Sequence, residues 1–212
     1  MLSGATIRET AVFSDGRLAA ARDRRWGFID RALNWIIEPS FDEVADFSEG
    51  LAGVKRGRHW GFVDKSGRLA VPPSYEFVWA FHDGVARVRQ GGLIGFMDRD
   101  GKSVLPPQFA SATSFNDGRA FASPADKAPF SLIDKLGNPL TPARFDTARE
   151  FAEGFAAVCQ HGHCGYIDRE GEWRIEPRFS HADSFHNGLA RVAWDGDRGY
   201  IDKSGRVVWK TP

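Results

Sequence analysis

The sequence is short of the features that mark most functional classes. Among its 212 residues there are only 2 cysteines, and 28 basic residues balance 28 acidic ones to leave no net charge. This balance argues against a general nucleic-acid or membrane-surface binder. No apolar run is long enough to span a bilayer, and the start of the chain lacks the basic and apolar regions of a secretion signal. We therefore expect a cytoplasmic protein with no membrane partner and no disulfide scaffold.

Recognisable catalytic motifs are missing as well. The chain has no phosphate loop, dinucleotide fingerprint, paired-histidine zinc helix or nucleophile elbow. Its acids and histidines form no constellation suited to acid–base or nucleophilic catalysis. No segment of useful length has the helical hydrophobic period. The sequence therefore predicts an all-β protein that is not an enzyme and uses no cofactor.

One short motif recurs along the whole chain. It reads Gly-aromatic-aliphatic-Asp, with a degenerate copy at Ser131–Asp134, and its aspartates are Asp30, Asp64, Asp98, Asp134, Asp168 and Asp202. Successive aspartates are 34, 34, 36, 34 and 34 residues apart. A fixed period of this size indicates a repeat array, because each repeat is too short to bury a core alone. We predict one domain over residues 1–212, with 1–12 as a cap or closing segment and repeats at 13–46, 47–80, 81–114, 115–150, 151–184 and 185–212.

The second repeat shows the anatomy expected of each unit. Three short antiparallel strands are predicted, at Leu51–Lys55, Trp60–Asp64 and Arg68–Val71. A tight turn at Arg56–His59 joins the first two strands, and a turn ending at Gly67 joins the second two. The third strand is expected to end at Pro72–Pro73, and residues 75–81 to cross to the next repeat as a short irregular or helical turn.

The two ends of the array are out of phase with each other. The last repeat lacks the crossover segment, and residues 7–13 resemble the missing piece. A closed propeller-like ring, in which this segment completes the last repeat, is the preferred arrangement because closure removes exposed strand edges. The alternative is an open curved β-repeat array in which the same segment is an end cap.

The residues common to all repeats are expected to hold the fold. An aspartate at the start of a tight turn accepts backbone N–H groups, so the repeated Asp is predicted to fix a turn rather than to catalyse a reaction. The repeated Gly before an aromatic predicts a close backbone approach or a bulge. The repeated Phe and Tyr side chains are predicted to form a core shared between neighbouring repeats.

These residues resemble the WG-repeat family, which is named for a Trp-Gly pair in each repeat. The resemblance rests on the recurring pattern Trp-Gly-Phe-Ile/Val-Asp, Lys-Ser-Gly-Arg, Pro-Pro and Asp-Gly, and it covers nearly the whole chain. The tryptophan itself remains only at Trp26 and Trp60, and the other repeats have Ile94, Phe130, Cys164 and Arg198. The resemblance implies a mainly bacterial interaction module, and it brings no catalytic residues to this chain.

Function is expected where the repeats differ, and the first difference is a Cys/His hairpin in the fifth repeat. If His161-Gly162 is a two-residue turn, Cys159 faces Cys164 as the close, non-hydrogen-bonded pair. Reduced thiols are the expected state, with a disulfide or a zinc site as alternatives. These two cysteines with His161 and His163 are weak metal candidates, because adjacent strand positions point oppositely and cannot easily surround a tetrahedral ion. No metal is therefore predicted.

Two further differences suggest binding surfaces. The fourth repeat has a longer loop at 122–129, and Pro124, Asp126 and Lys127 are candidate binding residues because insertions in repeats often mark the working face. The first-hairpin tips of the first three repeats are basic, with candidate residues Arg22, Arg24, Arg25, Lys55, Arg56, Arg58, His59, Arg87 and Arg89. The last two repeats have His161, His163, Asp195 and Asp197 there instead. The basic tips would suit an acidic protein surface or an anion.

The leading functional prediction is a non-catalytic protein–protein interaction module. It would be an adaptor or immunity-type protein that binds another protein through loops on one face. The alternative is a binder of a small molecule, carbohydrate or anion in a central or inter-repeat pocket, with Trp35, Trp79, Trp173 or Trp194 as the stacking surface. Exposed and clustered tryptophans would favour this alternative, whereas buried ones would favour core packing. Nucleic acid is not an expected partner.

Overall fold

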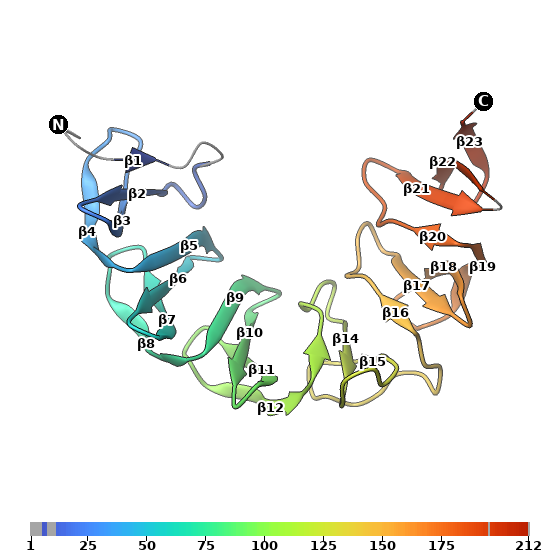
Figure 1. Cartoon of the computed structure of the whole chain (residues 1–212), viewed down its shortest axis with the longest axis horizontal. Helices are drawn as coiled ribbons and strands as arrows, with labels where there is room; N and C mark the ends of the chain where they lie inside the picture. Colours follow the sequence, from blue (N-terminus) through green and yellow to red (C-terminus); the bar gives the residue numbers. More distant parts are fainter. Residues whose placement is uncertain (1–5, 8–11, 195, 212) are drawn as a thin grey trace. The chain divides into compact units, whose positions relative to one another are not determined.

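The chain folds entirely as β-structure. The computed structural model describes residues 6–7, 12–194 and 196–211, and every regular element within them is a β-strand (Figure 1). No helical segment in these ranges has the length and apolarity to cross a bilayer. The chain divides into two compact units, Met1–Pro107 and Gln108–Pro212, called the N-terminal half and the C-terminal half below. The predicted all-β class is confirmed.

The N-terminal half contains three sheets of four strands each. Their strands are β1 (Thr6–Ile7), β2 (Leu18–Arg22), β3 (Arg25–Ile29) and β4 (Trp35–Phe41); β5 (Glu43–Ser48), β6 (Leu51–Arg56), β7 (His59–Asp64) and β8 (Leu69–Tyr75); and β9 (Phe77–His82), β10 (Val85–Gln90), β11 (Leu93–Asp98) and β12 (Ser103–Phe109). Strands adjacent in the sequence are adjacent in the sheet, so each sheet is an antiparallel meander (Figure 1).

The C-terminal half repeats this plan with one shorter sheet. Its strands are β13 (Ser111–Ala112), β14 (Ala120–Ser123) and β15 (Ser131–Ile133); β16 (Thr147–Ala148), β17 (Ala156–Gln160), β18 (His163–Ile167) and β19 (Trp173–Phe179); and β20 (His181–Ala182), β21 (Leu189–Trp194), β22 (Asp197–Asp202) and β23 (Val207–Lys210). In the fourth sheet a fourth strand is replaced by isolated bridges from Phe130 to Phe145 and from Ile133 to Pro139. The prediction of six antiparallel β units is confirmed.

The number of strands in each unit differs from the prediction. The crossover between repeats, which was expected to be irregular or helical, is a strand. It is β9 in the third sheet, where it pairs with β10 and brings the number of strands from three to four. A register shift between Ala86 and Val88 spaces its buried residues three apart, at Val78 and Phe81, which hides the two-residue alternation of a strand. The proline pair Pro72–Pro73 also does not end β8. It lies on an edge strand, where a missing N–H breaks no ladder.

The repeated aspartates fix turns, as predicted. Asp64 Oδ1 accepts hydrogen bonds from the backbone N–H groups of Ser66 at 2.9 Å and Arg68 at 3.0 Å. The hydrogen bond from the Ser66 hydroxyl, reinforced by those from Arg68, lowers the pKa of Asp64 to about 2, although desolvation acts in the opposite direction. The same pair of backbone bonds forms at Asp98, Asp134, Asp168 and Asp202. These carboxylates are engaged in the hydrogen bonds that form the turns.

The repeated glycine marks a close backbone approach, also as predicted. A Cβ added at Gly61 would lie 2.7 Å from the carbonyl carbon of Pro72 and would also meet the carbonyl oxygen of Val71. The ladder between β7 and β8 shifts register across Gly61 and again between Phe62 and Val63. Gly27, Gly95, Gly165 and Gly199 are approached by the fourth-strand backbone in the same way.

A second turn links neighbouring sheets at three places, and this link was not predicted. The turn between the first two strands has positive φ at two consecutive residues, for example 50° at Glu49 and 85° at Gly50. The acid of one such turn accepts the glycine N–H of the following turn. The pairs are Asp15 with Gly50 at 2.6 Å, Glu49 with Gly84 at 2.9 Å, and Glu153 with Gly188 at 3.0 Å. The acid therefore holds neighbouring sheets together as well as forming the turn.

The core lies between consecutive sheets. Phe62 of β7 packs edge-on against Phe81 of β9, with ring centroids 4.8 Å apart. The same contact joins Phe28 to Phe47 at 4.7 Å in the N-terminal half. In the C-terminal half it joins Tyr166 to Phe185 at 4.8 Å. The predicted core shared between repeats is confirmed, because each sheet buries its aromatic face only when the next sheet covers it.

The predicted exchange between the chain ends does not occur in the strand pairing. Strand β1 pairs with β2, through Thr6 opposite Ala21 and Ile7 opposite Ala20, and so forms the first strand of the first sheet. Among the described residues, the last sheet consists of β20 to β23. The rest of the predicted cap, residues 1–5 and 8–11, lies outside the described residues.

Candidate functional site

The basic tips predicted from the sequence lie at one end of the three sheets of the N-terminal half. Arg24 is in the β2–β3 turn with a φ of 61°, and Arg58 is in the β6–β7 turn beside His59. In an antiparallel meander the turns between second and third strands all lie at the same end of their sheets. We call this surface the basic turn end. Arg87 and Arg89 lie within β10, before the β10–β11 turn.

Several of these cations are held by acids that sequence reasoning missed. Arg22 pairs with Glu38 at 2.7 Å and Lys55 with Glu43 at 2.5 Å, while Arg25 pairs with Asp42. Others lie over aromatic rings: Arg56 is 4.8 Å from the Phe41 ring centroid, and Arg87 and Arg89 are 4.8 and 6.0 Å from that of Trp79. Much of the predicted charge is therefore neutralised or packed locally.

The acids beside the basic turn end have a position in the repeat that could have revealed them. Asp42 follows Phe41, and Glu76 follows Tyr75 at the equivalent place in the next repeat. Asp42 accepts the N–H of Gly57 at 2.7 Å, and Glu76 accepts those of Gly91 and Gly92 at 2.9 and 3.1 Å. An acid that recurs directly after the repeat aromatic thus marks a cap for the neighbouring hairpin turn.

Three polar side chains of the basic turn end remain exposed to solvent. Arg24, Arg58 and His59 are exposed, and within the described part of the chain they have no ion-pair partner. They come from two neighbouring hairpins. This is the part of the predicted basic surface that is available to a partner.

The longer loop of the fourth repeat lies in the other half of the chain. It joins β14 to β15, and Pro124, Asp126 and Lys127 are exposed. The Ser123 hydroxyl, at its base, donates to the carbonyl oxygens of Ala125 at 2.9 Å and Ala128 at 2.7 Å. The loop therefore has a defined conformation and belongs to the C-terminal half, whereas the basic turn end belongs to the N-terminal half.

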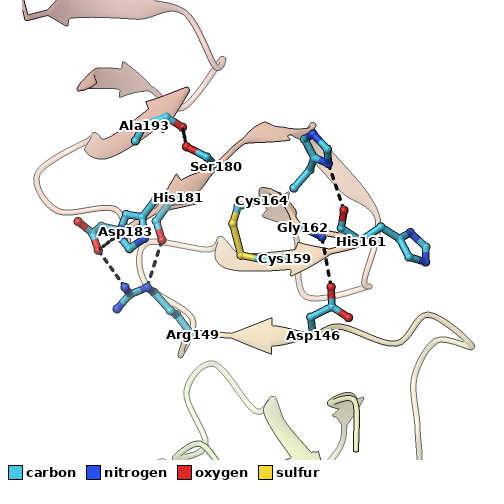
Figure 2. The surroundings of a disulfide bond; sticks show 12 residues. Asp146, Arg149, Cys159, His161, Gly162, Cys164, Ser180, His181, Asp183 and Ala193 are labelled. Atoms are coloured by element: carbon cyan, nitrogen blue, oxygen red, sulfur yellow. Dashed lines mark hydrogen bonds and ion pairs between the residues drawn. A yellow bond between two sulfur atoms is a disulfide. The ribbon is translucent and has the colours of Figure 1, made fainter. Parts of the chain in front are cut away.

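The Cys/His hairpin forms a disulfide, so the expectation of reduced thiols is wrong (Figure 2). The predicted register is confirmed, with Cys159 opposite Cys164 and Gln160 opposite His163. This pairing places the two Cα atoms 3.9 Å apart and the sulfurs at bonding distance. With both sulfurs bonded to each other, neither cysteine is a thiolate ligand for zinc. Across residues 6–7, 12–194 and 196–211, no group of three His, Cys, Asp or Glu side chains is arranged to hold a metal.

Reducing this disulfide is expected to lower the free energy of unfolding by at most about 2 kcal/mol, because the closed loop is short and the hairpin already holds its strands together. Urea unfolding with and without a thiol reductant measures the difference, and a Cys159→Ser/Cys164→Ser variant should match the reduced protein. A thiol assay on the denatured, unreduced protein should find no free thiol. Two reactive thiols there would contradict the disulfide.

The repeat pattern assigns the chain to a family. A family model described as "WG containing repeat" matches residues 26–57, 60–93, 94–123, 130–163 and 165–195. The chain belongs to this family. No curated protein matches it with significance. The resemblance noted from the Trp-Gly pattern is therefore confirmed.

Solved structures similar to this WG-repeat chain show its fold. A crystal structure of a eukaryotic initiation factor aligns with a TM-score of 0.65 and 12% identity over 96% of this chain and 65% of that chain. Hsv2p from Kluyveromyces lactis aligns with a TM-score of 0.54 and 10% identity over 94% of this chain and 73% of that chain. The WG-repeat chain thus spans just under two thirds of the initiation factor. These similarities support a propeller-like arrangement of sheets and carry no information on a shared partner.

The four tryptophans considered as a stacking surface do not gather in one place. Trp35, Trp79, Trp173 and Trp194 are half-buried and belong to four different sheets. Each has a neighbour of its own: Arg22 lies over Trp35, Phe77 packs on Trp79, Phe145 on Trp173 and Phe179 on Trp194. They act as separate packing elements rather than as one aromatic platform.

A pocket on the last sheet went unnoticed in the sequence. It has a volume of about 270 Å³ and is lined by His181, Arg191, Val192, Ala193 and Arg198. Arg198 occupies the Trp position of the last WG repeat, and this substitution was the one available signal. Of the other tip residues in the last two repeats, His161, His163 and Asp197 are exposed, and Asp195 lies outside the described residues.

Proposed function

We propose that this WG-repeat chain is a non-catalytic binding module that recognises an acidic surface of another protein through its basic turn end. The observation that carries the proposal is the exposure of Arg24, Arg58 and His59 on two neighbouring hairpins. Basic side chains that have no ion-pair partner in their own chain can attract a partner of opposite charge and fix the orientation in which it binds. The same proposal gives the module an adaptor or immunity-type role in the cytoplasm. It also makes the Pro124–Lys127 loop a second contact.

The disulfide is relevant to the cellular compartment of such a module. Disulfides persist mainly in oxidising compartments and are rare in the cytosol of most organisms. Cytoplasmic location rested on composition alone and stays a prediction.

The proposal predicts salt-dependent binding of an acidic probe. A fluorescein-labelled, glutamate-rich peptide is titrated with the protein, and its dissociation constant is measured by fluorescence anisotropy at several NaCl concentrations. Arg58→Glu is expected to weaken binding by about tenfold, because it replaces attraction with repulsion at an exposed tip. Affinity should also fall steeply with salt.

Lys102→Glu is the matched control. Lys102 is exposed in the β11–β12 turn, at the opposite end of the sheets from the basic turn end, and its reversal makes the same change in net charge. Affinity should be nearly unchanged in this variant. Equal losses in the two variants, or binding that is insensitive to salt, would reject the basic turn end as the contact surface.

A further inference from the structure

The last sheet presents a face that the earlier sheets keep covered. Tyr200 is 41% exposed, whereas the residues at its position in the other sheets (Phe28, Phe62, Phe96, Leu132 and Tyr166) are at most 1% exposed. Trp209 is 52% exposed, and its equivalents Ile37, Val71, Leu105 and Ile175 are 4–6% exposed. This face is therefore available for contacts that its counterparts cannot make.

The composition of this face has changed along with its exposure. Arg198 stands where Trp60 and Cys164 are buried, at 7% and 3% exposure. Arg191 stands where the second and fifth sheets have the small residues Gly53 and Ala157 and the third sheet has Arg87. Val78 of β9 packs on Gly53, whereas Arg191 and Arg198 are exposed.

Strand register brings the basic side chains of this face together. His181 of β20 is opposite Ala193 of β21, and Ala193 is opposite Arg198 of β22, so the three lie in one row on the same face. Arg191 is two residues from Ala193 along β21 and therefore shares the face. The small side chain of Ala193 leaves a hollow between the imidazole and the guanidinium. This hollow is the pocket of about 270 Å³.

An acid beside the pocket, Asp183, is engaged by three side chains. Asp183 contacts His181 Nε2 at 3.1 Å and pairs with Arg149 Nη2 at 3.0 Å (Figure 2). It also accepts a hydrogen bond from Arg191 Nε at 2.8 Å. Desolvation acts to raise the pKa of Asp183, but the hydrogen bonds from Arg191 and His181 outweigh it and lower the pKa. Arg149 and Arg191 therefore share this carboxylate.

An aromatic pair adjoins the basic hollow. Tyr200 is directly opposite Arg191 across β21 and β22, and its ring centroid lies 6.1 Å from that of Trp209. Two exposed rings beside a basic hollow provide a surface for an apolar or aromatic group attached to an anion. The site thus combines charge recognition at His181 and Arg198 with stacking at Tyr200.

We propose that this hollow binds the phosphate group of a small aromatic phosphate monoester, with Arg191, Arg198 and His181 on the phosphate and Tyr200 and Trp209 on the organic group. Two guanidinium groups and an imidazole line the hollow, and guanidinium groups suit phosphate oxygens. The volume falls just below the range of about 300–1,000 Å³ found for whole drug-sized ligands, so it suits a head group while the rest of the ligand lies outside. This site is in the C-terminal half and is independent of the basic turn end.

The test uses phenyl phosphate and inorganic phosphate as probes in calorimetric titrations of the full chain. Phenyl phosphate is expected to bind more tightly than inorganic phosphate, and Arg198→Gln is expected to weaken both by about tenfold, the loss of one charged hydrogen bond. Tyr200→Ala should bring phenyl phosphate down to the affinity of inorganic phosphate without changing the latter. Arg206→Gln, in the β22–β23 turn, is the matched control and should change neither.

Two results would overturn the proposal. One is the absence of heat from either probe at millimolar concentration, and the other is equal affinity in wild type and Arg198→Gln. Thermal melting of each variant guards against loss of fold as the cause. Arg198→Gln should leave the binding of the acidic peptide at the basic turn end unchanged, so failure of one proposal is distinguishable from failure of the other.

Discussion

Replacing Phe81 with alanine is expected to lower the free energy of unfolding by about 3–5 kcal/mol. Phe81 is fully buried, and its ring packs edge-on against Phe62 of the preceding sheet at 4.8 Å between centroids. The substitution removes the larger of the two side chains, Phe81 and Val78, that β9 contributes to the core between the second and third sheets. The resulting cavity cannot collapse easily, because both sheets are held by their own strand pairing.

Phe13 provides a control at the equivalent position of the first repeat. It is 39% exposed, so Phe13→Ala should cost no more than about 1 kcal/mol. Urea unfolding followed by circular dichroism gives both free energies. Similar losses for Phe13 and Phe81 would show that the stacking of sheets is not the main source of stability.

Replacing Gly61 with alanine is expected to cost about 3 kcal/mol or more, the upper range for overpacking. The added methyl group would lie 2.7 Å from both the Pro72 carbonyl carbon and the Pro73 nitrogen. These are backbone atoms of β8 and cannot rotate away as a side chain does. The strand would have to move out, breaking the contacts between β7 and β8 that close the sheet.

Gly53 is the matched control for this substitution. It lies on the neighbouring strand, and a Cβ there would meet the Cγ2 atom of Val78 at 3.1 Å, which is a side chain able to shift. Gly53→Ala should therefore cost about 1 kcal/mol or less. Thermal melting of both variants tests the difference. A Gly61→Ala protein that melts at the wild-type temperature would show that the close approach is not structurally required.

The features that could be read from the sequence are those set by neighbouring residues. The Asp64 turn was predictable because the carboxylate and the N–H groups that it accepts lie within four residues of each other. The pairing of Cys159 with Cys164 followed from a two-residue turn, which fixes the register of a hairpin. The role of Gly61 followed from its repetition before an aromatic residue.

The features that were missed depend on residues distant in the sequence. The pairing of β9 with β10 was hidden by a bulge, because the bulge breaks the alternation that identifies a strand. The charge of the basic turn end was overestimated, because Arg25 meets Asp42 between β4 and β5 and Lys55 meets Glu43 of β5. The pocket at His181 and Arg198 was missed because its residues are ordinary individually and come from three strands.

By itself the sequence determined the repeat period, the all-β class and the turn and glycine positions that define each sheet. These features depend on local backbone chemistry, and the same local pattern recurs in the six repeats. Only the tertiary structure decided that each full unit has a fourth strand, that Cys159 and Cys164 are bonded, and which cations remain available. It also decided that the motif position buried in every earlier sheet is exposed at Tyr200. Exposure and charge pairing depend on what packs across a sheet, and the same motif has different neighbours in each copy.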